Sequence, residues 1–156
     1  MPAMSQPPTA KILVVDDEDA IREYLQQILT EWGYTVITAA DGREALPVAV
    51  REQPDLILLD IAMPHLDGIE TCKRLRERPT TRAARVIILT AYDTRDRLEE
   101  SIAAGADDFL GKPINLTELR LRVTSMLKVK DTADAVERLE AYIRSLKELR
   151  ARDTAS

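Results

Sequence analysis

The chain has 156 residues, of which 45% are hydrophobic, so it can bury one ordinary core and we expect a single domain with appendages. Its formal net charge of −5 at pH 7, without a basic stripe interleaved with aromatic residues, argues against direct binding of nucleic acid. The only cysteine, Cys72, excludes an internal disulfide, and no apolar run approaches the ~20 residues that span a bilayer.

We expect no targeting signal at the beginning of the given sequence. Residues 1–9 have neither a basic start nor an apolar stretch, which predicts a short disordered leader rather than a signal peptide. With one cysteine and no membrane span, the protein is expected to be cytoplasmic.

From Lys11 onwards, short apolar runs alternate with amphipathic stretches, a pattern typical of a parallel sheet with crossover helices. The apolar runs predict strands over 11–16, 35–38, 56–60, 85–90 and 108–110. The amphipathic stretches predict helices over 19–32, from 42 towards 54, over 68–78 and around 98–103. Gly33 is a fitting stop for the first of these helices.

Two helices carry details that test the assignment. Pro47 lies inside the second predicted helix and removes a backbone hydrogen bond, so we expect that helix to be kinked or shortened. In the fourth, Leu98, Ile102 and Ala103 are predicted to form the buried face. The strands are apolar throughout rather than alternating, which indicates a sheet covered on both faces. We therefore predict an α/β, flavodoxin-like, doubly wound sheet of order 2-1-3-4-5.

The last part of the chain has a different character, because 114–156 contains neither glycine nor proline. Four apolar residues at helical spacing are predicted to pack on the sheet: Leu116, Leu119, Val123 and Leu127. Four more follow the alternating spacing of a coiled-coil seam: Val136, Leu139, Ile143 and Leu146. The segment 131–134 would also suit the cap of a separate helix, so continuity is left open. We divide the chain into the leader, a domain over 10–128 and a helical extension or linker over 129–156, through which a homodimer is expected.

Polar side chains follow the predicted strands at the points where they end. Asp16 ends the first strand and Asp17 follows it, Asp60 ends the third, Thr90 ends the fourth, and Lys112 follows the fifth. The carboxyl ends of parallel strands share one edge of the sheet, where ligands bind. Three acids, a hydroxyl and an ammonium therefore converge on one pocket, which suits a divalent cation beside a phosphoryl group.

These residues and their order resemble the receiver domain of two-component response regulators, and the single-domain chemotaxis regulator in particular, over about 10–128. The resemblance rests on the acidic pair Asp16-Asp17, the acceptor Asp60 with its Met-Pro-x-x-Asp-Gly loop, Thr90, and the Lys112-Pro113 pair. It implies that a partner histidine kinase or phosphotransfer protein donates a phosphoryl group to Asp60, and that the domain is a switch rather than an enzyme.

The resemblance also implies a role for each site residue. Asp17, Asp60 and the main-chain carbonyl of Ala62 would bind Mg²⁺ or Mn²⁺ directly, while Asp16 would act largely through water. Lys112, the Thr90 hydroxyl and the backbone N–H of Ala91 would hold the phosphoryl oxygens. Phe109 would change rotamer when Thr90 moves, so that the two form the element that responds to phosphorylation.

Other functions fit the residues less well. A phosphohydrolase of the haloacid dehalogenase type needs a second aspartate two residues after the nucleophile, and here that position is Ala62. A dinucleotide-binding domain needs a glycine fingerprint that the first strand lacks. A regulatory piece of a longer enzyme, such as a cyclic-di-GMP enzyme, remains open by analogy alone.

Overall fold

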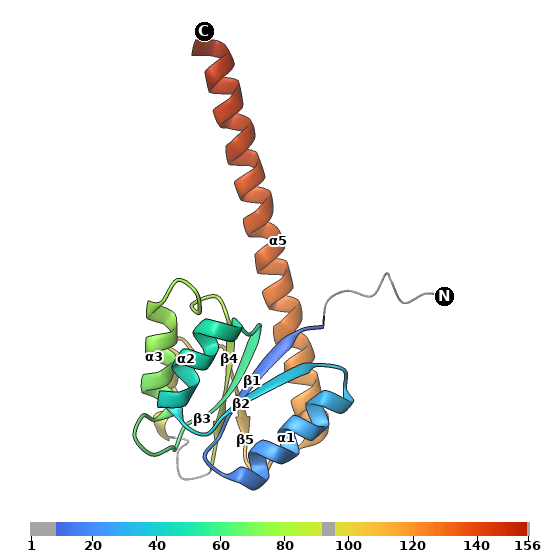
Figure 1. Ribbon diagram of the computed structural model, residues 1–156, viewed down its shortest axis with the longest axis vertical. Helices are drawn as coiled ribbons and strands as arrows, with labels where there is room; N and C mark the ends of the chain where they lie inside the picture. Colours follow the sequence, from blue (N-terminus) through green and yellow to red (C-terminus); the bar gives the residue numbers. More distant parts are fainter. Residues whose placement is uncertain (1–8, 92–95, 156) are drawn as a thin grey trace, which may run out of the picture.

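The computed structural model describes residues 9–91 and 96–155, with the side chains up to residue 152. Five parallel strands form one sheet of order β2-β1-β3-β4-β5, with helices on both faces, as Figure 1 shows. The strands are β1 (Lys11–Val15), β2 (Thr35–Ala39), β3 (Leu56–Asp60), β4 (Arg85–Thr90) and β5 (Asp108–Gly111). This is the predicted doubly wound architecture, and its strand order reverses between β1 and β3.

The five helices are α1 (Asp19–Glu31), α2 (Gly42–Glu52), α3 (Gly68–Glu77), α4 (Leu98–Ala103) and α5 (Leu116–Ala155). Gly33 ends α1 as predicted, because its φ of +98° lies in the left-handed region that favours glycine. The N–H of Tyr34 then donates to the carbonyl of Leu29, which satisfies an open group at the end of the helix.

Alternate residues of the strands supply two separate cores, one on each face of the sheet. Leu13 and Val15 pack with residues of α2 and α3, whereas Ile12 and Val14 pack with residues of α1 and α5. All four side chains are fully buried. Burial on both faces is the reason why these strands are apolar throughout.

Helix α2 continues through Pro47, so the predicted shortening is wrong. Pro47 and Arg43, four residues earlier, are both exposed. Water can therefore satisfy the Arg43 carbonyl that lacks a partner from the proline, which lowers the cost of proline at this position.

The predicted buried face of α4 is also wrong, although Leu98 is half-buried. Ile102 is 59% exposed and Ala103 is exposed, whereas Ser101 and Ala104 are buried. The hydroxyl of Ser101 donates to the carbonyl of Arg97 at 3.1 Å, so this polar side chain is buried with its hydrogen bond made. A pattern based on hydrophobicity alone misplaces such a face.

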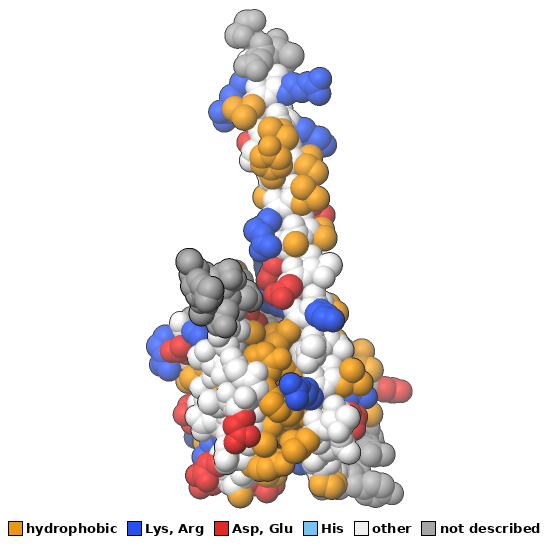
Figure 2. Space-filling model, turned by 90° about the vertical axis from the view of Figure 1, so that its right-hand side faces the viewer, with side chains coloured by type: hydrophobic (Ala, Val, Ile, Leu, Met, Phe, Trp, Pro, Cys, Tyr) orange, Lys and Arg blue, Asp and Glu red, His pale blue; other side chains and the backbone are white. Residues whose placement is uncertain are grey.

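Helix α5 is one continuous element of 40 residues, and 131–134 lie within it rather than capping a second helix. Leu119, Val123 and Leu127 are buried against the sheet, while Leu116 is partly exposed. Beyond Leu127 the helix leaves the body on the side where the strands begin (Figure 1). Figure 2 shows hydrophobic side chains along this free part of the helix. Within 9–91 and 96–155, no helix is long and apolar enough to cross a membrane.

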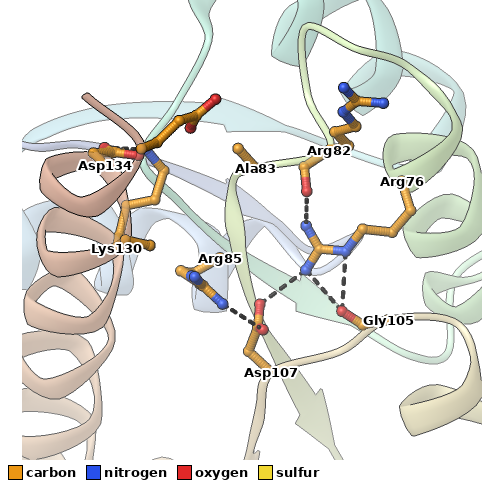
Figure 3. A pocket seen from close by; sticks show the side chains of 10 residues that line it. Arg76, Arg82, Ala83, Arg85, Gly105, Asp107, Lys130 and Asp134 are labelled. Carbon is orange, nitrogen blue, oxygen red and sulfur yellow. Dashed lines mark hydrogen bonds and ion pairs between the residues drawn. The ribbon is translucent and has the colours of Figure 1, made fainter. Parts of the chain in front are cut away.

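An arginine near the end of α3 makes several hydrogen bonds at the edge of the sheet where β4 begins (Figure 3). The guanidinium of Arg76 donates to the carbonyls of Arg82 at 2.7 Å and Gly105 at 3.0 and 2.7 Å, and pairs with Asp107 at 2.8 Å. Between this cluster and α5 lies a pocket of about 300 Å³, whose α5 lining residues are Lys130, Ala133, Asp134 and Glu137. These residues mark the side of the helix that faces the body.

Candidate functional site

The predicted site residues lie at the carboxyl ends of the strands. Asp16 and Asp60 are buried, with exposures of 0% and 4%, and Thr90 is equally buried at the end of β4. Asp17 is exposed. The site therefore combines two sheltered carboxylates with one that is open to solvent.

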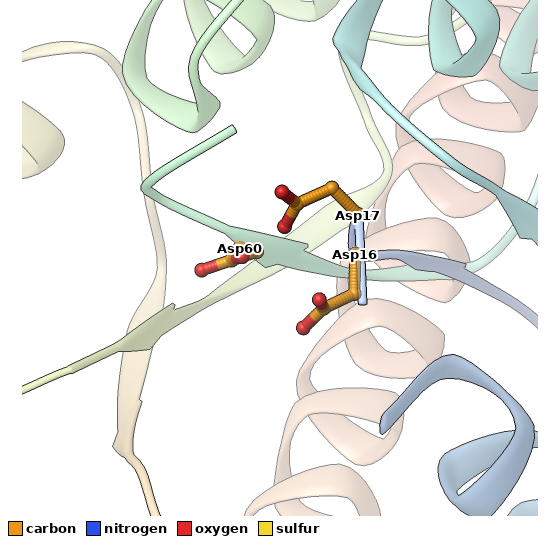
Figure 4. Close-up of side chains that lie close together, drawn as sticks. All are labelled: Asp16, Asp17 and Asp60. Atoms are coloured by element: carbon orange, nitrogen blue, oxygen red, sulfur yellow. The ribbon is translucent and has the colours of Figure 1, made fainter. Parts of the chain in front are cut away.

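The three aspartates form a compact acidic cluster, which Figure 4 shows from close by. Each of Asp16, Asp17 and Asp60 offers a carboxylate oxygen, and these oxygens lie within 4.8 Å of one another. The Asp16 carboxylate accepts a hydrogen bond from the backbone N–H of Glu18 at 2.9 Å, and its main-chain carbonyl accepts one from Arg22 at 2.7 Å. These two bonds hold Asp16 in place within the cluster.

Lys112 provides the positive charge of the site. Its Nζ lies 3.0 Å from Oδ2 of Asp16 and 3.4 Å from Oδ2 of Asp60, so its shorter contact is with Asp16. The backbone N–H of Lys112 donates to the carbonyl of Thr90 at 2.8 Å, and the Lys112-Pro113 peptide bond is cis. This one ammonium contacts two of the three clustered carboxylates, so the cluster keeps negative charge that can attract a divalent cation.

Burial and the neighbouring carboxylate of Asp16 raise the pKa of Asp60 to about 6, even though the Lys112 ammonium acts to lower it. For Lys112, burial acts to lower the pKa, but the hydrogen bond to Asp16 and the charge of Asp60 outweigh it and the pKa is raised. The lysine therefore stays charged at neutral pH, while Asp60 ionises at a cost. A cation beside Asp60 would reduce that cost.

The loop after Asp60 is fixed by a close backbone approach at Gly68. A Cβ atom at this position would lie 2.3 Å from the carbonyl oxygen of Asp60, so only glycine fits there. The N–H of Gly68 donates to the carbonyl of Ile61 at 3.0 Å, and Asp67 caps α3 by accepting from Glu70 at 2.9 Å. Ala62, whose carbonyl is a predicted metal ligand, is exposed in this loop.

The two predicted switch residues lie on neighbouring strands. Thr90 ends β4, and Phe109 on β5 pairs in register with Ile88, two residues before Thr90. Phe109 is partly buried and packs against the core that α2 and α3 cover. Ala91 directly follows Thr90 and is half-buried. Tyr92 lies outside the described residues.

Some contacts beside the site, among the described residues, have little or no signal in the sequence. One is the ion pair between Lys112 and Asp16, which joins residues 96 positions apart and has no local signal. Another joins Arg97 to Asp67 at 3.2 Å, between the start of α4 and the cap of α3. Arg97 also pairs with Glu100 at 3.4 Å. The i,i+3 spacing of Arg97 and Glu100 is a sequence signal for this pair, whereas the pair with Asp67 has none.

Comparison with known proteins shows the family of this chain. The model of the response regulator receiver domain matches residues 12–124. The chain is 44% identical over 133 residues to response regulator PleD of Caulobacter vibrioides, a match that covers 85% of this chain and 29% of PleD. The chain thus spans less than two thirds of PleD, and it spans 50 to 55% of other curated response regulators that it matches.

Solved structures resemble the fold at similar identity. Chemotaxis protein CheY4 of Vibrio cholerae matches with a TM-score of 0.73 and 35% identity, covering 76% of this chain and 99% of CheY4. The receiver domain of sensor histidine kinase PA1611 from Pseudomonas aeruginosa, solved with a magnesium ion in its active site cleft, matches with a TM-score of 0.72 and 30% identity, covering 78% and 99%. The cluster at the strand ends, the sheet order and the matched residues agree, and the chain belongs to the response regulator receiver domain family.

Proposed function

We propose that Asp60 accepts a phosphoryl group from a partner histidine kinase or phosphotransfer protein. The observation that carries this proposal is a buried carboxylate flanked by two further aspartates and one lysine, at the end of a central strand. In the reaction, a carboxylate oxygen of Asp60 bonds to phosphorus while the bond from phosphorus to the donor's histidine nitrogen breaks, and that nitrogen keeps the electron pair. The product is an acyl phosphate on Asp60.

The residues present fit a hard divalent cation, Mg²⁺ or Mn²⁺. The fit rests on the donor set, because carboxylate oxygens from three residues lie within 4.8 Å of one another and one of them faces solvent. Asp17, Asp60 and the Ala62 carbonyl would hold the ion, with Asp16 acting through water. When bound, it would supply positive charge against the phosphoryl oxygens.

Lys112, Thr90 and Ala91 would hold the phosphoryl group. Lys112 stays charged and would shift its ammonium from Asp60 towards a phosphoryl oxygen, while its bond to Asp16 keeps it in the site. The Thr90 hydroxyl and the Ala91 N–H would donate to the remaining oxygens. Movement of Thr90 would free space for Phe109 to turn inward, which converts the modification into a change of surface that a downstream partner can read.

This function is favoured over an aspartate-based phosphohydrolase. Ala62 occupies the position where such an enzyme needs a proton donor, and its methyl group cannot transfer a proton. The match covers only 29% of PleD, so PleD contains further sequence outside it. We therefore include in this proposal that the receiver domain controls an output, either attached to it or separate from it. The absence of direct nucleic-acid binding stays a prediction.

Incubation with a small phosphodonor and Mg²⁺, followed by intact mass, tests the proposal. One added phosphoryl group that requires the metal supports it. A phosphohydrolase would instead consume the donor without accumulating the modified chain. Failure to take up a phosphoryl group from any small donor or kinase would overturn the proposal.

We expect the phosphorylated state to be long-lived for this family. Hydrolysis needs a water in line with the bond from phosphorus to Asp60, and the positions two past Asp60 and two past Thr90 border that approach. Ala62 offers no hydrogen bond to such a water, and Tyr92, outside the described residues, is bulky. Ala62→Asn combined with Tyr92→Glu should shorten the lifetime by on the order of tenfold, since a positioned polar group can orient or activate the water.

The decay of the added mass after removal of the donor measures this lifetime. Ala62→Ser with Tyr92→Phe is the matched control, because it makes smaller changes at the same two positions. An unchanged decay rate in the Asn/Glu variant would refute the hypothesis.

We also propose a homodimer through the free part of α5. The apolar residues Val136, Leu139, Ile143 and Leu146 are each more than 40% exposed, so a second helix would remove them from water. Leaving such a side chain exposed forgoes ~1.5–3 kcal/mol. Light scattering at tens of micromolar should give a dimer for the full chain and a monomer for a version that ends at Lys128.

A point variant in the full chain makes the same test without truncation. Ile143→Lys places a charge among the apolar residues and should give a monomer, whereas Ala141→Lys, on another side of the helix, should stay dimeric. A monomeric full chain would disprove the dimer and would leave phosphoryl transfer to Asp60 untouched.

A further inference from the structure

The free part of α5 carries apolar residues over a greater length than the sequence pattern indicated. Val129, just beyond the buried Leu127, is 44% exposed and continues the series towards the body. We call the following residues the distal seam: Val129, Thr132, Val136, Leu139, Ile143 and Leu146. Their spacing alternates between three and four, and the five apolar members are 42 to 58% exposed.

The distal seam points away from the body of the domain. Lys130, Asp134 and Glu137 line the pocket against the arginine cluster, so their side of α5 faces the body. Successive residues of a helix are turned by about 100°. This puts Leu139 and Ile143 roughly opposite to that side, and Val129 and Val136 about a quarter turn from it. A second helix can therefore lie along the seam without a collision with the body that carries it.

The residue types of the seam select one arrangement of two helices. In a heptad that starts at Val129, the a positions hold Val129, Val136 and Ile143, which are all β-branched. The d positions hold Thr132, which is polar, and then Leu139 and Leu146. β-Branched residues at a with leucine at d favour a parallel, two-stranded coiled coil.

The residues that flank the seam are compatible with the same arrangement. In a parallel coil, each g position lies beside the e position five residues later on the partner helix. Here Ala135 would meet Glu140 of the second copy, and Tyr142 would meet its Lys147. No pair brings like charges together, and the tyrosine ring can cover the aliphatic stem of the lysine.

We propose that a second copy of this chain covers the distal seam as a parallel, in-register, two-stranded coiled coil. This inference rests on the proposed homodimer and specifies its geometry. Both receiver bodies then lie at the same end of the coil, and the two Leu146 side chains face each other. An antiparallel coil would instead place Leu146 opposite Val129 of the partner and the bodies at opposite ends.

Disulfide formation in the full chain distinguishes the two geometries. Leu146→Cys should cross-link to itself under mild oxidation, because a d position meets its own counterpart in a parallel coil. Ala141→Cys, turned away from the seam, is the matched control and should link at least tenfold more slowly. The native Cys72 is fully buried, and burial raises the pKa of its thiol to about 11, so it contributes little background.

Each outcome decides the proposal. Rapid self-linking of Leu146→Cys in a dimeric protein supports the parallel coil. Linking only in a mixture of Val129→Cys and Leu146→Cys chains overturns it in favour of the antiparallel coil. Equal cross-linking rates for Leu146→Cys and Ala141→Cys would show that the distal seam is not the contact between the two copies. Intact mass after incubation with a phosphodonor is measured on the same proteins. This measurement tests phosphorylation of Asp60 separately, so a wrong coiled-coil geometry is distinguished from a wrong receiver function.

Discussion

Replacement of Asp60 by asparagine is expected to abolish the mass increase that a small phosphodonor and Mg²⁺ produce. The amide keeps the size of the side chain but lacks the anionic oxygen that attacks phosphorus. Asp17→Asn should leave the acceptor intact and raise the Mg²⁺ concentration needed for half-maximal modification. We expect this Mg²⁺ concentration to rise roughly tenfold or more, because even the loss of a residue that only supports a metal ligand lowers metal affinity by about 10–100-fold.

Asp134→Asn is the control for both variants, because Asp134 lies on α5 at the opposite edge of the sheet, where it pairs with Lys130. It should be modified like the unchanged chain. A mass increase that persists in Asp60→Asn would identify a different acceptor. An unchanged Mg²⁺ requirement in Asp17→Asn would remove Asp17 from the proposed metal ligands.

The same Asp60→Asn substitution should make the metal-free protein more stable at pH 7.5. Asp60 has a pKa of about 6 in the folded chain against an ordinary value of 3.8, so the folded state binds the proton more tightly. The free energy of unfolding therefore falls as pH rises between these values, and the full cost is present above pH 6. At 1.36 kcal/mol per pKa unit, the Asp60→Asn substitution should raise the free energy of unfolding at pH 7.5 by about 1–3 kcal/mol.

Urea denaturation in the presence of a chelator, at pH 4 and pH 7.5, measures this effect. The difference between the unchanged chain and Asp60→Asn should be largest at pH 7.5 and should shrink towards pH 4, where Asp60 is mostly protonated. Addition of Mg²⁺ should stabilise the unchanged chain more than the variant and narrow the gap. A variant that is less stable at pH 7.5 would contradict the cause assigned to the raised pKa.

Much of the fold could be predicted from the sequence because its cues are local. Apolar runs bounded by turn residues mark the strands, and the glycine after α1 marks a helix end. The position of Asp60 at the end of a strand follows from the same pattern. Because parallel strands end at one edge, the approach of Asp16 and Asp17 to Asp60 also follows without coordinates.

The remaining features depend on tertiary packing. The ion pair between Lys112 and Asp16 is set by where two distant side chains point. The buried face of α4 is decided by Ser101, which a hydrophobic pattern counts as exposed although its hydroxyl is satisfied within the helix. Segment 131–134 has capping residues that compete with helix continuity, and sequence propensity does not determine which of the two prevails.

The straight course of α5 gives this small domain a mechanical advantage. About 28 residues lie beyond Leu127, so at 1.5 Å per residue the free arm is about 42 Å long. A tilt of about 5° at the buried base, where Leu119 and Val123 pack on the sheet, would move the far tip by about 4 Å for an arm of that length. A small repacking at the base of α5 can therefore leave the shape of the body unchanged. It still moves the far tip about as far as the distance between neighbouring Cα atoms.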